Sequence, residues 1–277
     1  MLKQRILTAV VLLGILIPAL VHPDPVWIAL AGMVLVSAAA WEWGRLNQLE
    51  FRSSLWMSAL CIIFCALVWQ FNLLHFFARG FWLLLGGWWV LMAGFLLAGG
   101  VQRWSRIPLA VRWGVGLLLL CCTWLALMMS KTFSIDFLMS VLLLVWIADI
   151  AAYFSGKAFG KHKLAPGISP GKTWEGVVGA VAGVFLLSYV WLTATDYFSW
   201  PSSSIFDRLS AHGFVVLVSG LLFLVIMSVA GDLIESLVKR SAGAKDSSQL
   251  LPGHGGILDR IDALLPTLPL AVMLALI

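Results

Sequence analysis

The chain has 277 residues, of which 61% are hydrophobic and only 11% are charged. A water-soluble domain contains about 25% charged residues, so this composition excludes an ordinary soluble fold. The net charge of +5 does not indicate nucleic-acid binding, because the basic residues lie at the ends of apolar runs and form no basic stripe with interleaved aromatic residues.

Repeated apolar runs of about 20 residues predict an all-α, polytopic integral membrane protein. Nine candidate spans lie at 6–22, 25–42, 54–72, 81–100, 108–129, 136–156, 174–195, 212–231 and 263–277. The first follows Lys3 and Arg5, as in a signal peptide, but no small-residue cleavage site precedes a soluble region, so we predict a retained span. The ninth is short and is interrupted by Pro266 and Pro269, which leaves open whether it crosses fully.

The basic residues also predict the orientation of the spans, because they are enriched in cytoplasmic segments. With the N-terminus in the cytoplasm, the inner segments contain 14 lysines and arginines and the outer loops contain 3. The long charged loops 157–173 and 232–262 then face the cytoplasm. By content, residues 1–130 form a transmembrane scaffold, and residues 131–277 form a transmembrane catalytic region that includes both loops.

Asp149 is a charged residue inside or at the edge of the sixth predicted span. A charge at mid-span costs about 2.5–3.5 kcal/mol on insertion scales, so its presence needs a reason. Either the carboxylate reaches water at the membrane interface, or it lines a polar site on the helix face that it shares with Tyr153. The sequence leaves both interpretations open.

The loop after the sixth span, 156–175, reads GKAFGKHKLAPGISPGKTWE. It is not a Walker A loop, because only three residues separate its glycine from Gly-Lys-Thr and no strand is expected before it. The candidate substrate-binding residues here are Ser169, Lys172, Thr173 and Glu175. The lysine offers a cation to a phosphate, and the others offer hydroxyls or an acceptor for a base or ribose. Helix capping is the competing interpretation of the hydroxyl and carboxylate residues.

The most polar stretch, 231–262, follows the eighth span and reads GDLIESLVKRSAGAKDSSQLLPGHGGILDRID. If the preceding helix continues, one of its faces carries four polar side chains, those of Asp232, Glu235, Ser236 and Lys239. Asp259 and Asp262 share a face of the next helix in the same way. Carboxylates on two helices that face one gap suit Mg²⁺, which prefers oxygen ligands and commonly bridges to substrate phosphates.

Two segments resemble a known family. Residues 169–176 read SPGKTWEG, and residues 236–262 contain SLVKR, KD and LPGHGGILDRID in that order. The second pattern is similar to the signature of the phosphatidate cytidylyltransferases (CDP-diacylglycerol synthases), and the first is similar to the Ser-Pro-x-Lys-Thr-x-Glu-Gly segment that precedes it in that family. The resemblance covers most of the C-terminal half, whereas the N-terminal half matches only as a series of membrane spans.

The resemblance implies an integral membrane enzyme that makes CDP-diacylglycerol and pyrophosphate from CTP and phosphatidate in phospholipid biosynthesis. The expected step is in-line attack of a phosphatidate oxygen on the α-phosphate of CTP, catalysed by positioning and charge neutralisation. We expect a bacterial inner membrane with the active site facing the cytoplasm. No nucleic-acid partner is expected, and a homodimer is left open.

On this interpretation the acidic residues hold Mg²⁺, and a second cation is left open. The expected main ligands are Asp232 and Asp259, followed by Asp246 and Asp262. The other expected catalytic residues are four basic side chains and a histidine: Lys239, Arg240, Lys245, Arg260 and His254. The basic side chains would neutralise phosphates, and the histidine would orient a phosphate or protonate the leaving group. Gly255 and Gly256 precede a helix, where free N–H groups suit a phosphate.

Two other functions stay open at this point. A CTP-dependent lipid kinase, such as a dolichol-kinase-like enzyme, would share the nucleotide site but transfer the γ-phosphate. A transporter would use Asp149 and the interrupted ninth span, although transporter sites lie near the membrane midplane and the polar residues here cluster in cytoplasmic loops. The Asp-Gly-x-x-Ala-Arg pattern of CDP-alcohol phosphotransferases is absent.

Overall fold

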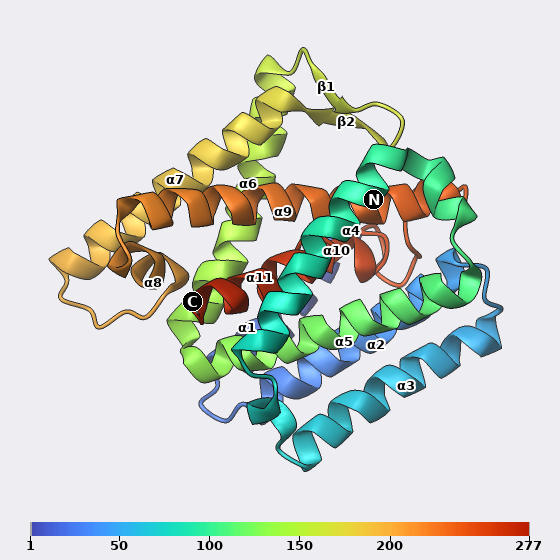
Figure 1. Ribbon diagram of the computed structural model, residues 1–277, viewed down its shortest axis with the longest axis horizontal. Coiled ribbons are helices and arrows are strands. Elements are labelled where there is room, and N and C mark those ends of the chain that lie inside the picture. Colours follow the sequence, from blue (N-terminus) through green and yellow to red (C-terminus); the bar gives the residue numbers. More distant parts are fainter. Residues whose placement is uncertain (1, 277) are drawn as a thin grey trace.

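The computed structural model describes residues 2–276 and is helical apart from one small β-hairpin (Figure 1). The side chains of residues 2–7 and of Ala9 are not described. Two of the basic residues in the orientation argument, Lys3 and Arg5, therefore lie outside the described side chains. The prediction of a cytoplasmic N-terminus stays a prediction.

Seven helices in the described part of the chain are long and apolar enough to cross a membrane. They are α2 (Val26–Leu46), α3 (Phe51–Gln70), α4 (Arg79–Arg106), α5 (Leu109–Phe133), α6 (Ile135–Phe159), α7 (Trp174–Tyr197) and α9 (Phe214–Ser241). They confirm seven of the predicted spans and the all-α membrane fold. Helix α1 (Leu2–Val21) precedes them and contributes a shorter apolar portion, Val10–Val21.

The predicted ninth span is instead a short helix inside the protein. Helix α11 (Leu264–Ala275) has 12 residues, which at 1.5 Å per residue is well short of the membrane's hydrocarbon thickness of about 30 Å. Every residue from Leu265 to Val272 is buried, and the helix packs against α4, α5 and α9. The predicted count of nine spans is therefore not confirmed, because apolar composition does not distinguish a helix buried in protein from one facing lipid.

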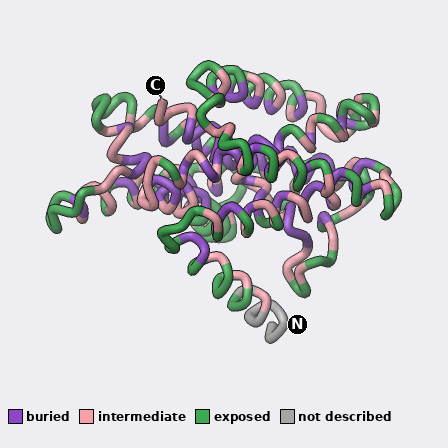
Figure 2. The backbone as a smooth tube through the Cα atoms, turned by 90° about the horizontal axis from the view of Figure 1, so that it is seen from below, coloured by how far each residue is buried: buried purple, intermediate pink, exposed green. Residues whose placement is uncertain are grey.

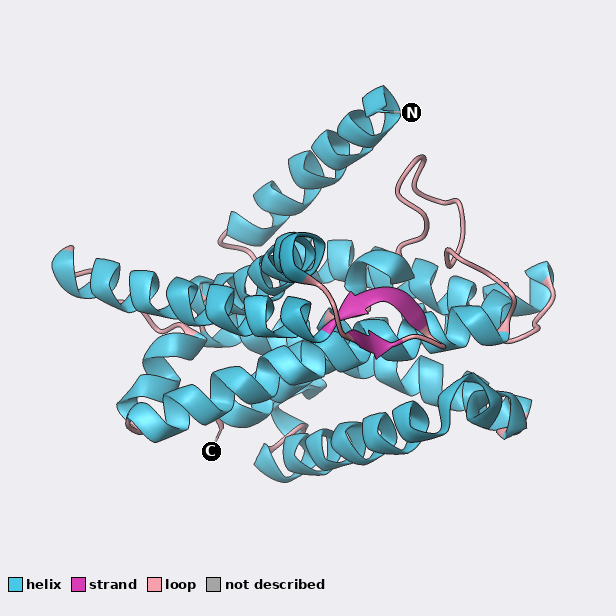
Figure 3. Cartoon of the chain, turned by 90° about the horizontal axis from the view of Figure 1, so that it is seen from above, coloured by secondary structure: helices cyan, strands magenta, loops and turns pink. Residues whose placement is uncertain are grey.

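The shorter elements connect the spans. They are η1 (Leu73–Phe76), strands β1 (Lys163–Ala165) and β2 (Ser169–Thr173), and helices α8 (Ile205–Ala211) and α10 (Leu258–Ile261). The two strands pair antiparallel, so the predicted loop 157–173 contains a β-hairpin (Figure 3). The hairpin lies beyond the ends of α6 and α7 (Figure 1). Helix α9 continues to Ser241, as the spacing of its polar residues predicted, so the predicted loop 232–262 begins as helix.

Buried residues run through the middle of the helix assembly, and exposed residues lie on its outer faces (Figure 2). Many of the exposed side chains are large and apolar, such as Leu84, Leu91 and Val178. In a water-soluble protein this surface would promote aggregation. Around membrane-spanning helices it is the surface that contacts lipid tails.

Helices α6 and α7 approach each other closely through small residues. A Cβ atom at Gly179 would collide with the Ser155 side chain, and one at Gly183 would lie 2.7 Å from the Cβ atom of Ala151. Both distances are too short for ordinary contact, so the backbones could not come this near with larger residues. This pairing determines where the hairpin between the two helices sits.

We expect Gly179→Leu to reduce the free energy of unfolding by about 1–3 kcal/mol, because the new side chain must force α7 away from α6. Gly87→Leu is the matched control, since a Cβ atom at Gly87 on α4 would meet nothing within 4 Å. Unfolding of both variants in mixed micelles measures the difference. Equal stability of the two variants would contradict the close approach of α6 and α7.

Candidate active site

The hairpin between α6 and α7 brings one predicted motif against the other. Lys172, near the end of β2, forms an ion pair with Asp232 on α9, with Nζ 2.6 Å from Oδ2. Asp232 also accepts a hydrogen bond from the Ser236 hydroxyl, one turn further along α9. The SPGKTWEG segment and the polar face of α9 thus form one site, although they are far apart in the sequence.

Local hydrogen bonds hold the hairpin in this position. Strand pairing places Lys163 opposite Thr173, and the Thr173 hydroxyl accepts from the Gly176 N–H and caps α7. Glu175 bonds to both the backbone N–H and the ring Nδ1 of His162, the latter at 2.7 Å. The capping interpretation is therefore confirmed for Thr173, while Glu175 joins the start of α7 to the loop before β1. No such bond involves the Ser169 side chain within the described residues.

Besides Asp232, the carboxylates of Asp262 and Asp149 lie within electrostatic range of Lys172. Asp262 lies just after α10, and burial raises the pKa of its carboxyl well above the usual value. The neighbouring Asp232 and Asp149 carboxylates raise that pKa further, and Lys172 opposes them. Asp149 on α6 is also within electrostatic range of Arg260. Asp149 is exposed, so its carboxylate can reach water while it also lies near these charged groups, and both interpretations stay open.

Lys239 lies between two carboxylates, those of Glu235 and Asp259. Its Nζ is 2.5 Å from Glu235, one turn back on α9, and 2.6 Å from Asp259 on α10. Glu235 is 1% exposed, so its charge depends on this lysine. Lys239 was predicted to neutralise substrate phosphates, but in the structure it neutralises protein carboxylates and ties α9 to α10.

Asp259 is similarly occupied by protein groups. Besides Lys239, it accepts from the backbone N–H groups of Ser247 at 2.9 Å and Gly256 at 2.8 Å. Burial alone would raise the pKa of Asp259, but the bonds from Lys239, Gly256 and Ser247 outweigh it and lower the pKa to about 2. Asp259 therefore resembles a structural anchor more than an open metal ligand, and the Gly256 N–H is already used.

The remaining predicted residues lie on or beside the loop between α9 and α10. Arg240 donates to the carbonyl of Ile168 at 3.3 Å, which joins this loop to the hairpin. Arg260 donates twice to the carbonyl of His254, at 3.2 and 2.7 Å. Lys245 and Asp246 are exposed.

Left-handed glycines make the loop turn tightly. Gly253 and Gly255 have φ values of 77° and 82°, and Leu251 and Gly255 form an isolated bridge. A side chain at either glycine would be strained. The turn presents His254, whose Nδ1 atom is buried without a partner among the described residues.

Two buried acidic residues were not among the predicted site residues. The sequence placed Glu235 on the polar face of α9, but no catalytic, binding or metal-ligating function was predicted for it. Glu42, near the end of α2, was overlooked although it bonds to the loop before α10. An acidic residue in an apolar run was the available signal for Glu42, as it was for Asp149.

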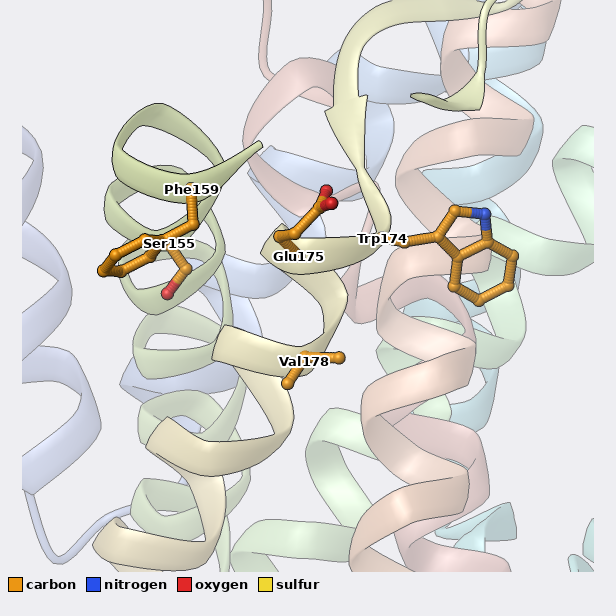
Figure 4. A pocket seen from close by; sticks show the side chains of 5 residues that line it. All are labelled: Ser155, Phe159, Trp174, Glu175 and Val178. Atoms are coloured by element: carbon orange, nitrogen blue, oxygen red, sulfur yellow. The ribbon is translucent and has the colours of Figure 1, made fainter. Parts of the chain in front are cut away.

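A surface cavity of about 490 Å³ adjoins the hairpin (Figure 4). Its lining comes from the end of α6 and the start of α7: Ser155, Phe159, Trp174, Glu175 and Val178. Most of this lining is apolar. The cavity is thus an apolar hollow next to the basic hairpin.

The acidic residues do not form a closed metal cage. Among residues 2–276, no three His, Cys, Asp or Glu side chains come together closely enough to enclose a metal ion. The grouping of Asp232 with Asp262 and Asp149 still supplies the oxygen donors that Mg²⁺ prefers. Mg²⁺ is commonly held by only one or two carboxylates together with substrate phosphates, so this donor set fits.

Comparison with known proteins agrees with the two motifs. The sequence profile of a family described as the cytidylyltransferase family matches residues 3–277. A protein of Pseudomonas aeruginosa named phosphatidate cytidylyltransferase is 39% identical over 281 aligned residues, which cover 97% of this chain and 95% of the relative. A protein of the same name from Haemophilus influenzae is 36% identical over 287 aligned residues, covering 97% and 96%. A third, from Brucella suis, is 48% identical over 124 residues, covering 43% and 39%.

We expect Lys239→Met to destabilise the protein by about 3–5 kcal/mol, because it leaves the buried carboxylates of Glu235 and Asp259 without their cation. Lys245→Met removes the same charge from an exposed position and should change stability by less than about 0.5 kcal/mol. Chemical unfolding of both variants in micelles measures this contrast. Equal stability of the two variants would mean that Lys239 is free to serve the substrate instead.

Proposed function

The chain belongs to the cytidylyltransferase family and is a nucleotidyltransferase, and we propose how it transfers the cytidylyl group of CTP to phosphatidate. The products are CDP-diacylglycerol and pyrophosphate. The observation that carries the proposed site is the ion pair between Lys172 on the hairpin and Asp232 on α9. It joins two motifs at one end of the membrane-spanning helices, where a lipid phosphate and a soluble nucleotide can meet.

The proposed reaction is a displacement at the α-phosphorus of CTP. A phosphate oxygen of phosphatidate forms a new bond to this phosphorus, and the bond from the phosphorus to the oxygen that bridges to the β-phosphate breaks. Pyrophosphate leaves with the electron pair of that bond. The attacking oxygen is already an anion, so no base must remove a proton, and catalysis depends on positioning and charge neutralisation.

The side chains of the site divide this work. Lys172 and Arg260 are cations next to the carboxylate group, and they would bind the phosphates of CTP and of the lipid. The buried, unpaired Nδ1 atom of His254 suits a hydrogen bond to one of those phosphates. The apolar cavity beside Trp174 suits the hydrocarbon part of the lipid substrate rather than the nucleotide.

The carboxylates would hold a divalent cation. Asp232 and Asp262, with Asp149 beside them, suit Mg²⁺ better than Asp259 does, because Asp259 already accepts from Lys239, Ser247 and Gly256. When bound, Mg²⁺ would neutralise the charge that develops on the phosphates. A second cation could bind the same group of carboxylates.

The site is proposed to face the cytoplasm of a bacterial inner membrane. The loop segments around it contain most of the basic residues that lie outside the spans, and such residues are enriched on the cytoplasmic side. This orientation also exposes the site to CTP.

We expect purified protein to transfer label from α-³²P-CTP to a lipid when phosphatidate and Mg²⁺ are supplied. Asp232→Asn should reduce the rate at least about 100-fold, because it removes a charge that orients Lys172 and the cation. Asp196→Asn is the control, since Asp196 is exposed near the far end of α7 and should leave the rate unchanged.

The labelled product decides between reaction classes. Label in a CDP-lipid supports the proposal. Transfer from γ-labelled but not α-labelled CTP would establish a lipid kinase instead. Absence of any labelled lipid with folded protein would refute the proposed reaction.

The orientation can be measured by cysteine labelling, because the native cysteines are all buried. In right-side-out vesicles we expect a membrane-impermeant maleimide to label Asp196→Cys, at the end of α7 opposite the hairpin, but not Gly171→Cys in the hairpin. In inverted vesicles the pattern should reverse. The opposite result would place the site outside the cytoplasm.

A further inference from the structure

Glu42 is a carboxylate of the N-terminal half that contacts the loop bearing the site. It lies near the end of α2, and its side chain is completely buried. A buried carboxylate is unfavourable unless hydrogen bonds or an opposite charge replace its water. Within the described residues no lysine or arginine pairs with Glu42, so neutral donors must stabilise it.

All of these donors come from the segment 247–258. The Oε1 atom accepts from the Ile257 N–H at 2.9 Å and from the Ser248 hydroxyl, and the Oε2 atom accepts from the Leu258 N–H at 2.6 Å and lies 3.1 Å from the Ser247 hydroxyl. Each carboxylate oxygen therefore has one backbone and one hydroxyl partner. The Glu42 side chain thus binds both ends of the segment 247–258.

The packing around this carboxylate leaves no spare room. A Cβ atom at Gly256 would collide with Glu42 and with the Ser247 hydroxyl. The glycine is therefore needed for close approach of the backbone, rather than for an unusual backbone conformation. This explains one of the two adjacent glycines more directly than phosphate binding does.

The segment that Glu42 holds leads directly into the site. Helix α10 begins at Leu258, and Asp259, Arg260 and Asp262 follow at once. The Ser247 hydroxyl also lies 2.9 Å from Asp259. Because it has one hydrogen, it can donate to only one of the two carboxylates at a time.

We propose that Glu42 is a positioning residue that holds the loop 247–258 and the start of α10 against the end of α2. It touches none of the reacting groups and acts through the backbone that carries Asp259, Arg260 and Asp262. Its effect on catalysis rests on the proposed function, whereas its hold on the loop does not. Helix α2 would then contribute to the site and would not be only part of a scaffold.

Glu42→Gln tests this proposal, because it keeps the shape but places an NH₂ group among donors. In full-length protein in phosphatidate-containing nanodiscs, we expect amide hydrogen exchange in 247–258 to rise at least about ten-fold, with the core of α9 unchanged. We also expect the KM for CTP to rise and kcat/KM to fall at least about ten-fold. A mere loss of folded protein would lower the apparent kcat and leave KM unchanged.

Three further variants keep the test decisive. Glu50→Gln changes an exposed carboxylate of the same half and should behave like the wild type. Glu42→Asp keeps the negative charge, so its KM for CTP should lie between those of the wild type and Glu42→Gln. Ser248→Ala removes one donor and should give a smaller change in the same direction, and it decides the question if Glu42→Gln fails to fold.

Two results would overturn the proposal. One is unchanged exchange in 247–258 in both Glu42→Gln and Ser248→Ala. The other is faster exchange spread evenly over the whole protein, which would indicate general destabilisation. If the wild type forms no CDP-lipid, the proposed function fails, but the exchange comparison still tests the contact between Glu42 and the loop.

Discussion

A carboxylate buried where membrane helices end is stable only when donors replace the water that it has lost. This constraint organises the polar end of the protein. Glu42 is surrounded by neutral donors from one loop, Asp259 shares Lys239 with Glu235, and Asp232 pairs with Lys172. Each carboxylate connects two segments that are distant in the sequence, so satisfying the charges also assembles the site.

The two groups of carboxylates serve different purposes. Glu42 and Asp259 accept several hydrogen bonds from protein groups, and together with Lys239 they join α2, α9 and α10. Near Lys172, by contrast, burial and the neighbouring Asp232 and Asp149 carboxylates raise the pKa of Asp262. The divalent cation proposed for this position would favour the ionised carboxylates.

Hydropathy predicted seven spans correctly, because lipid requires long apolar helices with internal backbone bonding. The period of the polar residues also predicted that α9 continues past Gly231. Neither signal could show that α11 is enclosed by protein or that Lys239 pairs inward, since both depend on which helices become neighbours. Glu42 was missed for the same reason: its partners lie more than 200 residues away in the sequence, and a local pattern contains no information about such contacts.

The position of α11 has a consequence for biosynthesis. This helix follows all seven spans in the sequence, so it leaves the ribosome after they do. Yet it fills the space between α4, α5 and α9, and it makes close contacts such as that between Met273 and Gly86. Spans inserted one after another during translation must therefore leave this space open, or filled by lipid, until α11 arrives. The final packing of the membrane core is thus a late, post-insertion event.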